Sequence, residues 1–110
     1  MYVYDEANRL AKAIKESKEY LEYKQAKENI QSIPEMKEKL EEFDKLKYEV
    51  QVLSFQGEKQ DEEKMKKLQE LYTILTAEEK IKEYFDVEVR FNIMLADVNR
   101  IISESVKDLL

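Results

Sequence analysis

The chain has 110 residues, of which 43% are hydrophobic and 40% charged, and its formal net charge is −6. This length predicts a single domain, residues 1–110, that buries about two-thirds of the surface exposed by the unfolded chain. Cysteine and histidine are both absent, which excludes disulfides, thiolate metal sites and histidine acid–base catalysis. We therefore expect no cofactor, no metal site, no small-molecule substrate and no enzymatic activity.

The single glycine and single proline leave few residues for the tight turns of β proteins, so the composition predicts an all-α fold. The first residues lack the basic and apolar blocks of a signal peptide. No apolar run has the length of a membrane span. We expect a cytoplasmic protein that has no membrane partner.

Apolar residues at helical spacing predict five helices, of which the first two cover about 3–16 and about 18–31. Ser17 is the expected N-cap of the second helix, because its hydroxyl can accept a hydrogen bond from a free backbone N–H. The apolar positions of these two helices are Val3, Ala7, Leu10, Ala11 and Ile14, followed by Tyr20, Leu21, Tyr23, Ala26 and Ile30.

The third helix is expected over about 34–56, with Pro34 in its first turn and Gly57 as its left-handed C-cap. Asp61 is the expected cap of a fourth helix. The predicted buried faces of the two helices are Met36, Leu40, Phe43, Leu46, Val50 and Leu53, then Met65, Leu68, Leu71, Tyr72 and Leu75.

Residues 76–79, Thr-Ala-Glu-Glu, match a capping box that would open a fifth helix over about 77–108. Its main apolar face is Ile81, Tyr84, Phe91, Leu95, Val98, Ile102 and Leu109. The sequence therefore predicts an antiparallel helical bundle with two long helices, over 34–56 and 77–108.

Each long helix also has apolar residues on a second side. We call these the Tyr48 stripe (Tyr48, Val52 and Phe55) and the Val89 stripe (Val89, Ile93 and Ala96). A helix that is apolar on two sides is covered by neighbours on both, either within the fold or across an interface. A helix of about 30 residues is on the order of 45 Å long, which exceeds a compact monomer of this size. We expect the two stripes to form a homodimer interface, with burial inside the monomer as the alternative.

Glu88 lies within the apolar arc of the fifth helix. Without a nearby base or ligand cluster, a lone carboxylate there is expected to pair with Arg90, Lys82 or a tyrosine hydroxyl. A second hypothesis for function is direct RNA binding through a local patch that includes Lys82, Arg90 and Arg100. The acidic net charge argues against nucleic acid as a partner, because phosphate neutralisation supplies most of the affinity.

Three stretches together resemble the YlbF/YmcA family of small helical bacterial proteins, most of all its YheA-type branch. They are Tyr4-Asp5-x-Ala7-x-x-Leu10-Ala11-x-Ala13-Ile14-x-x-Ser17-x-Glu19-Tyr20-x-x-Tyr23-x-x-Ala26, then Phe43 to Gln51 with Gln56-Gly57, and Glu88-x-Arg90-Phe91-x-x-Met94-Leu95-x-Asp97-Val98-x-Arg100-Ile101-Ile102.

The resemblance implies a self-associating, all-helical, cytoplasmic protein whose partners are other proteins, among them RNA-processing regulators. In the family, YlbF and YmcA act with YaaT on ribonuclease Y and messenger-RNA processing, and so on competence, biofilm formation and sporulation. Cysteines near the C-terminus of YlbF and YmcA help to hold iron–sulfur clusters. This chain has no cysteine, so cluster binding does not carry over.

Overall fold

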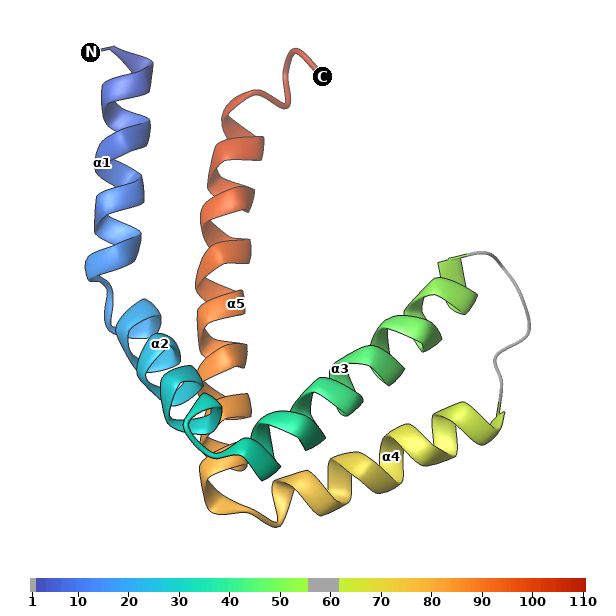
Figure 1. The fold of residues 1–110 in the computed structure, drawn as a ribbon. Helices are drawn as coiled ribbons and strands as arrows, with labels where there is room; N and C mark the ends of the chain where they lie inside the picture. The colour runs from blue at the N-terminus through green and yellow to red at the C-terminus, as the bar shows by residue number, and fades with distance from the viewer. Residues whose placement is uncertain (1, 56–61) are drawn as a thin grey trace. The chain divides into compact units, whose positions relative to one another are not determined.

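A computed structural model of the chain describes residues 2–55 and 62–110. All regular structure in these residues is helical, which confirms the all-α prediction of five helices (Figure 1). The helices are α1 (Val3–Glu16), α2 (Lys18–Gln31), α3 (Pro34–Phe55), α4 (Glu62–Thr76) and α5 (Glu79–Ser105). The fifth helix is shorter than the expected range of 77–108, because it begins two residues later and ends three residues earlier.

The helices form two compact units, and each is described by itself. The terminal unit comprises Met1–Lys27 and Tyr84–Leu110, and the central unit comprises Glu28–Glu83. Most of α2 and most of α5 belong to the terminal unit, while α3 and α4 belong entirely to the central unit.

In the terminal unit, α1 ends and α2 begins at Ser17. The Ser17 backbone is extended, with φ −69° and ψ 150°, so it cannot continue a helix. Its hydroxyl donates to the carbonyl of Ile14 at 2.6 Å and accepts from the Tyr20 N–H at 3.2 Å. One side chain therefore satisfies a helix end and a helix start, which confirms the expected N-cap.

Aromatic side chains join α2 to α5 within the terminal unit. The ring of Phe91 lies 6.2 Å from that of Tyr20 and 5.3 Å from that of Tyr23, and Tyr23 also contacts Tyr84 at 5.6 Å. Higher residue numbers on α2 meet lower numbers on α5, so the two helices run antiparallel. Rings at these separations attract each other beyond the area that they bury.

In the central unit, α3 and α4 pack against each other in antiparallel directions (Figure 1). The ring of Phe43 lies 6.0 Å from that of Tyr72, and Lys64 Nζ is 3.5 Å from a carboxylate oxygen of Glu49. Pro34 opens α3 as expected. The most deeply buried apolar side chains belong to this unit, with relative exposures of 0–1%: Ile30, Leu75 and Ile81.

The predicted capping box at the start of α5 is wrong. Thr76 is the last residue of α4, and its hydroxyl donates to the α4 carbonyls of Tyr72 at 2.8 Å and Thr73 at 3.3 Å. At the start of α5, the backbone carbonyl of Glu78 instead accepts from the amides of the third and fourth residues of the helix, Ile81 and Lys82. Gly57 and Asp61, the expected caps between α3 and α4, lie outside the described residues.

Candidate interaction surface on helix α5

The Val89 stripe lies in the terminal unit and faces away from the residues that α5 buries. Val89 is 55% exposed and Ile93 57%, and Ala96 is exposed as well. On the same helix Tyr84 and Val87 are only 5% and 6% exposed. At 3.6 residues per turn, the stripe is roughly half a turn around the axis from these two residues. More than half of Val89 and of Ile93 stays exposed, so burial within its own unit does not explain the apolar character of the stripe.

The Tyr48 stripe lies on α3 in the central unit and has a mixed character. Tyr48 is 67% exposed, whereas Val52 is half-buried. The side chain of Phe55 falls outside the described part of the chain. Because Val52 is half-buried, the exposed apolar surface of this stripe is less continuous than that of the Val89 stripe.

The Val89 stripe is the centre of a longer pattern that the sequence analysis did not identify. Exposed residues follow one another at alternating steps of three and four, which is the spacing of the contact positions of a coiled coil. We call this set the α5 seam: Asp86, Val89, Ile93, Ala96, Arg100 and Ser103. It extends about 26 Å along the helix. Because the residues at both ends of the seam are polar, a search for apolar periodicity does not detect the whole pattern.

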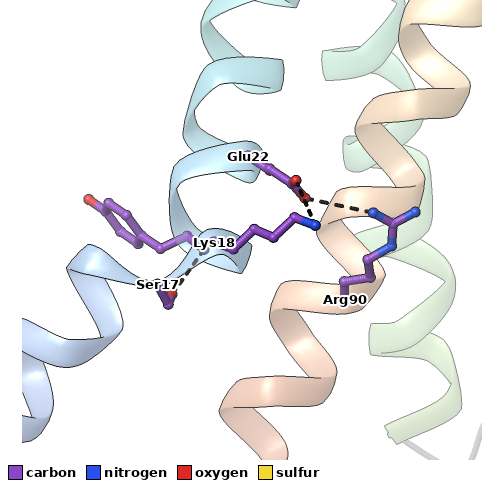
Figure 2. A network of polar contacts seen from close by, with 5 residues as sticks. Ser17, Lys18, Glu22 and Arg90 are labelled. Carbon is purple, nitrogen blue, oxygen red and sulfur yellow. Dashed lines mark hydrogen bonds and ion pairs between the residues drawn. The ribbon is translucent and has the colours of Figure 1, made fainter.

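A small network of charges lies beside the α5 seam, where α2 approaches α5 (Figure 2). The Glu22 carboxylate on α2 is shared by two cations, Lys18 Nζ at 3.7 Å and Arg90 Nη1 at 3.7 Å. These groups, with Glu19 and Ile93, line an open cavity of about 300 Å³. The apolar centre of the seam is therefore bordered by charged side chains, as is usual for protein interfaces.

Glu88 is half-buried between the seam and the aromatic contacts of α2 and α5, and it pairs with a tyrosine as expected. The Tyr23 hydroxyl donates to its carboxylate at 3.2 Å and lies 3.5 Å from the Tyr84 hydroxyl. Because Tyr23 has a single proton and donates it to the carboxylate, the Tyr84 hydroxyl supplies the proton of the second contact. Burial raises the pKa of the Tyr84 phenol well above its usual range, and the contact with Tyr23 and the charge of Glu88 raise it further. The network ties α2 to α5, which is a structural role.

Helix α1 and the end of α5 expose residues of the apolar faces that the sequence analysis identified. None of the residues of α1 is buried, and Val3 is 76% exposed. On α5, Ile102 is 51% exposed, and Leu109, expected on the same face, lies beyond the helix end and is 82% exposed. Periodicity showed that these helices have an apolar side but did not show that the chain leaves it uncovered.

The described residues, 2–55 and 62–110, contain no cluster of three or more side chains placed to hold a metal ion. None of their helices is both long and apolar enough to cross a membrane.

A family model described as "Control of competence regulator ComK, YlbF/YmcA" matches residues 3–107, nearly the whole chain. The chain belongs to the YlbF/YmcA family. This family is linked to control of the competence regulator ComK. The finding confirms the family resemblance that the three stretches of sequence indicated.

Two relatives of this YlbF/YmcA protein are UPF0342 proteins of similar length. One, from Alkalihalophilus pseudofirmus, is 34% identical over 97% of this chain and 91% of its own. The other, from Symbiobacterium thermophilum, is 36% identical over 94% of this chain and 93% of its own. A solved structure of a protein of unknown function (DUF964) from Bacillus stearothermophilus has the same fold, with a TM-score of 0.84 and 17% identity, over 97% of this chain and 94% of that one.

Proposed function

We propose that this protein is a non-catalytic, cytoplasmic interaction module that forms a homodimer through α5 and acts on protein regulators of RNA processing. The observation that carries the proposal is the exposed Val89 stripe, set against the buried side of the same helix. Scattered exposed apolar residues are ordinary, but a row at coiled-coil spacing is typical of a surface that another helix covers.

The functional context of the proposal comes from the family. Its description names control of the competence regulator ComK, which is a regulatory role. The resemblance to YlbF and YmcA further suggests ribonuclease Y and messenger-RNA processing as the process that is regulated. In this scheme the homodimer presents two copies of each remaining surface to a partner, and the Tyr48 stripe is one candidate for contact with that partner.

Direct RNA binding through a basic patch is the weaker hypothesis. Arg90 pairs with Glu22, and Arg100 pairs with Asp97 at 3.6 Å and Glu104 at 3.7 Å. Arginines already matched with carboxylates add little net positive charge, and phosphate binding depends on such charge. Titration of labelled RNA at low and high salt would support this hypothesis only if affinity fell steeply with salt.

Substitution of two isoleucines of nearly equal exposure tests the homodimer. Ile93 on the stripe is 57% exposed and Ile74 on α4 is 56% exposed. We expect Ile93→Glu to give a monomer by size-exclusion chromatography with light scattering at tens of micromolar, because an ionised carboxylate in an apolar contact is costly to desolvate. The matched variant Ile74→Glu should remain a dimer, and both should keep their helical circular dichroism.

Two results would contradict the proposed homodimer. One is a parent protein that is monomeric at tens of micromolar. The other is an Ile93→Glu variant that stays dimeric while Ile74→Glu dissociates, which would move the interface to the central unit. The regulatory role is tested separately, by asking whether Ile93→Glu fails to restore ComK-dependent competence to a host that lacks the parent gene.

A further inference from the structure

The geometry points to a second copy of this chain as the occupant of the α5 seam, with the two α5 helices antiparallel about a two-fold axis centred between Ile93 and Ala96. This inference rests on the proposed homodimer and adds the direction, the register and the charge contacts. All of the residues involved lie on α5 within the terminal unit, and all are exposed. They are therefore available to a partner without any rearrangement of the fold.

The charged positions of the seam favour the antiparallel direction. In a parallel two-fold pair each seam residue faces its own copy, so Arg100 would face Arg100 and Asp86 would face Asp86. Like charges brought together in a contact layer repel each other, at a cost that rises as water is excluded. In the antiparallel pair, Arg100 instead faces Val89 and Asp86 faces Ser103, while Ile93 packs on Ala96 twice.

Residues on the flank of the seam select one register. Arg90 and Asp97 are seven residues apart on the same flank, and their side chains are 61% and 58% exposed. In the register centred between Ile93 and Ala96, Arg90 of each copy lies near Asp97 of the other, so the same ion pair forms twice. A shift by one heptad in one direction brings Arg90 against Arg90, and in the other direction Asp97 against Asp97. The register with Asp97 against Asp97 would also bring Arg90 near Glu104, but it sets Ile93 against Ser103. Only the central register combines opposite charges at Arg90 with the apolar contact of Ile93 and Ala96.

The existing contacts of Arg90 leave it able to accept such a partner. Arg90 and Lys18 share one carboxylate, that of Glu22, at 3.7 Å each (Figure 2). An arginine has five N–H donors in a fixed fork, so one long contact to Glu22 does not exhaust them. An incoming carboxylate from a second copy would meet two cations at the edge of the cavity that Ile93 also lines.

A charge exchange tests the arrangement. Arg90→Glu alone and Asp97→Arg alone each convert two attractive contacts of the dimer into two repulsive ones. Exposed ion pairs are weak, so we expect each variant to raise the dimer dissociation constant by about tenfold. The double variant Arg90→Glu/Asp97→Arg restores opposite charges at both contacts and should return to within about threefold of the parent.

The two single variants should also rescue each other. In a mixed dimer, the carboxylate introduced by Arg90→Glu faces the guanidinium introduced by Asp97→Arg, and the second contact keeps its native pair of Arg90 and Asp97. Sedimentation velocity of the equimolar mixture should therefore show more dimer than either variant alone at the same total concentration. Arg9→Glu, a charge reversal on α1 at a side chain 79% exposed, is the control and should dimerise like the parent.

Arg90→Glu also breaks the contact between Arg90 and Glu22. The loss of this contact cannot explain a weaker dimer that recovers in the double variant, because the double variant lacks the contact as well. Failure of both the double variant and the mixture to recover the dimer would overturn the antiparallel register. If Ile93→Glu still gave a monomer in that case, the homodimer through α5 would stand. A different pair of results would replace the inferred register with the one in which Arg90 faces Arg90. In that case an equimolar mixture of Arg90→Glu with the parent would form more dimer than either protein alone, and Asp97→Arg would dimerise like the parent.

Discussion

The central and terminal units use their apolar residues in different ways. The central unit buries Ile30, Leu75 and Ile81 almost completely. The terminal unit places its aromatic residues between α2 and α5, but it leaves Val89 and Ile93 more than half exposed and buries no residue of α1. Both contain amphipathic helices, so helix formation alone does not explain the difference.

This comparison shows that the apolar pattern of a helix has two separate uses. In the central unit folding buries part of the pattern almost completely, because α3 and α4 cover each other, although Tyr48 and Ile74 remain more than half exposed. In the terminal unit part of the pattern remains available after folding, and the proposed homodimer covers the α5 seam with a second copy of the chain. Substitutions of the buried residues of the central unit should therefore affect unfolding, whereas substitutions in the α5 seam should affect association.

The largest expected effect is on the central unit. Leu75→Ala removes a side chain that is 1% exposed, and such truncations cost about 2–5 kcal/mol of unfolding free energy through lost transfer energy and the remaining cavity. The neighbouring Ile74 is 56% exposed, so Ile74→Ala should cost less than about 1 kcal/mol. Urea unfolding followed by circular dichroism measures both. Equal losses for the two variants would contradict the assignment of Leu75 to a closed core.

A smaller effect is expected for the terminal unit at alkaline pH. The unfolded phenol of Tyr84 ionises near its ordinary pKa of 10.0, whereas in the folded chain burial and the contact with Tyr23 raise the pKa and keep the phenol protonated. Above pH 10 the folded state therefore binds one more proton than the unfolded state, and stability falls as pH rises, by at most about 1.4 kcal/mol per pH unit.

Comparison of two tyrosine variants isolates this contribution. Tyr84→Phe should show a shallower loss of unfolding free energy between about pH 10 and 11 than the parent, whatever its stability at neutral pH. Tyr48→Phe, at a position 67% exposed, should follow the parent. Identical slopes for the parent and Tyr84→Phe would show that the phenol is not held protonated by the fold.

The smallest effect is expected at the junction of α1 and α2. Ser17→Ala removes both hydrogen bonds of the hydroxyl, to Ile14 and from Tyr20, and loss of an N-cap costs about 1 kcal/mol. Ser105→Ala removes only a contact to the carbonyl of Ile102 at the exposed end of α5 and should change stability by less than about 0.5 kcal/mol. Thermal unfolding compares the two, and the cap at Ser17 would be unimportant if they lowered the melting temperature equally.

Local chemistry made much of the fold predictable from the sequence. Ser17 and Pro34 mark helix starts because each has a property that only a helix start uses well, a short hydroxyl in one case and a missing N–H in the other. The capping box failed for a related reason. Thr76 can bond forward to α5 or back to α4, and the sequence does not show which helix offers the better acceptor.

The candidate surface was predictable only in part. Periodicity identified Val89, Ile93 and Ala96 as a second apolar side of the helix, and the structure shows that side to be exposed. It could not show that α1 would remain uncovered, because the pattern of one helix carries no information about the distance to its neighbours. Glu88 was expected to have one of three kinds of partner, and only the packing of α2 on α5 selects Tyr23.

The most direct test of self-association is the solution mass of the unaltered chain across a dilution series. The α5 seam is about 26 Å long, which is short for a coiled coil, so we expect a dissociation constant in the micromolar range rather than an obligate dimer. Sedimentation equilibrium at about 50 µM should then give a mass approaching twice the chain mass of 13.2 kDa, falling toward one chain mass on dilution below about 1 µM. A mass of one chain throughout that range would contradict self-association through α5.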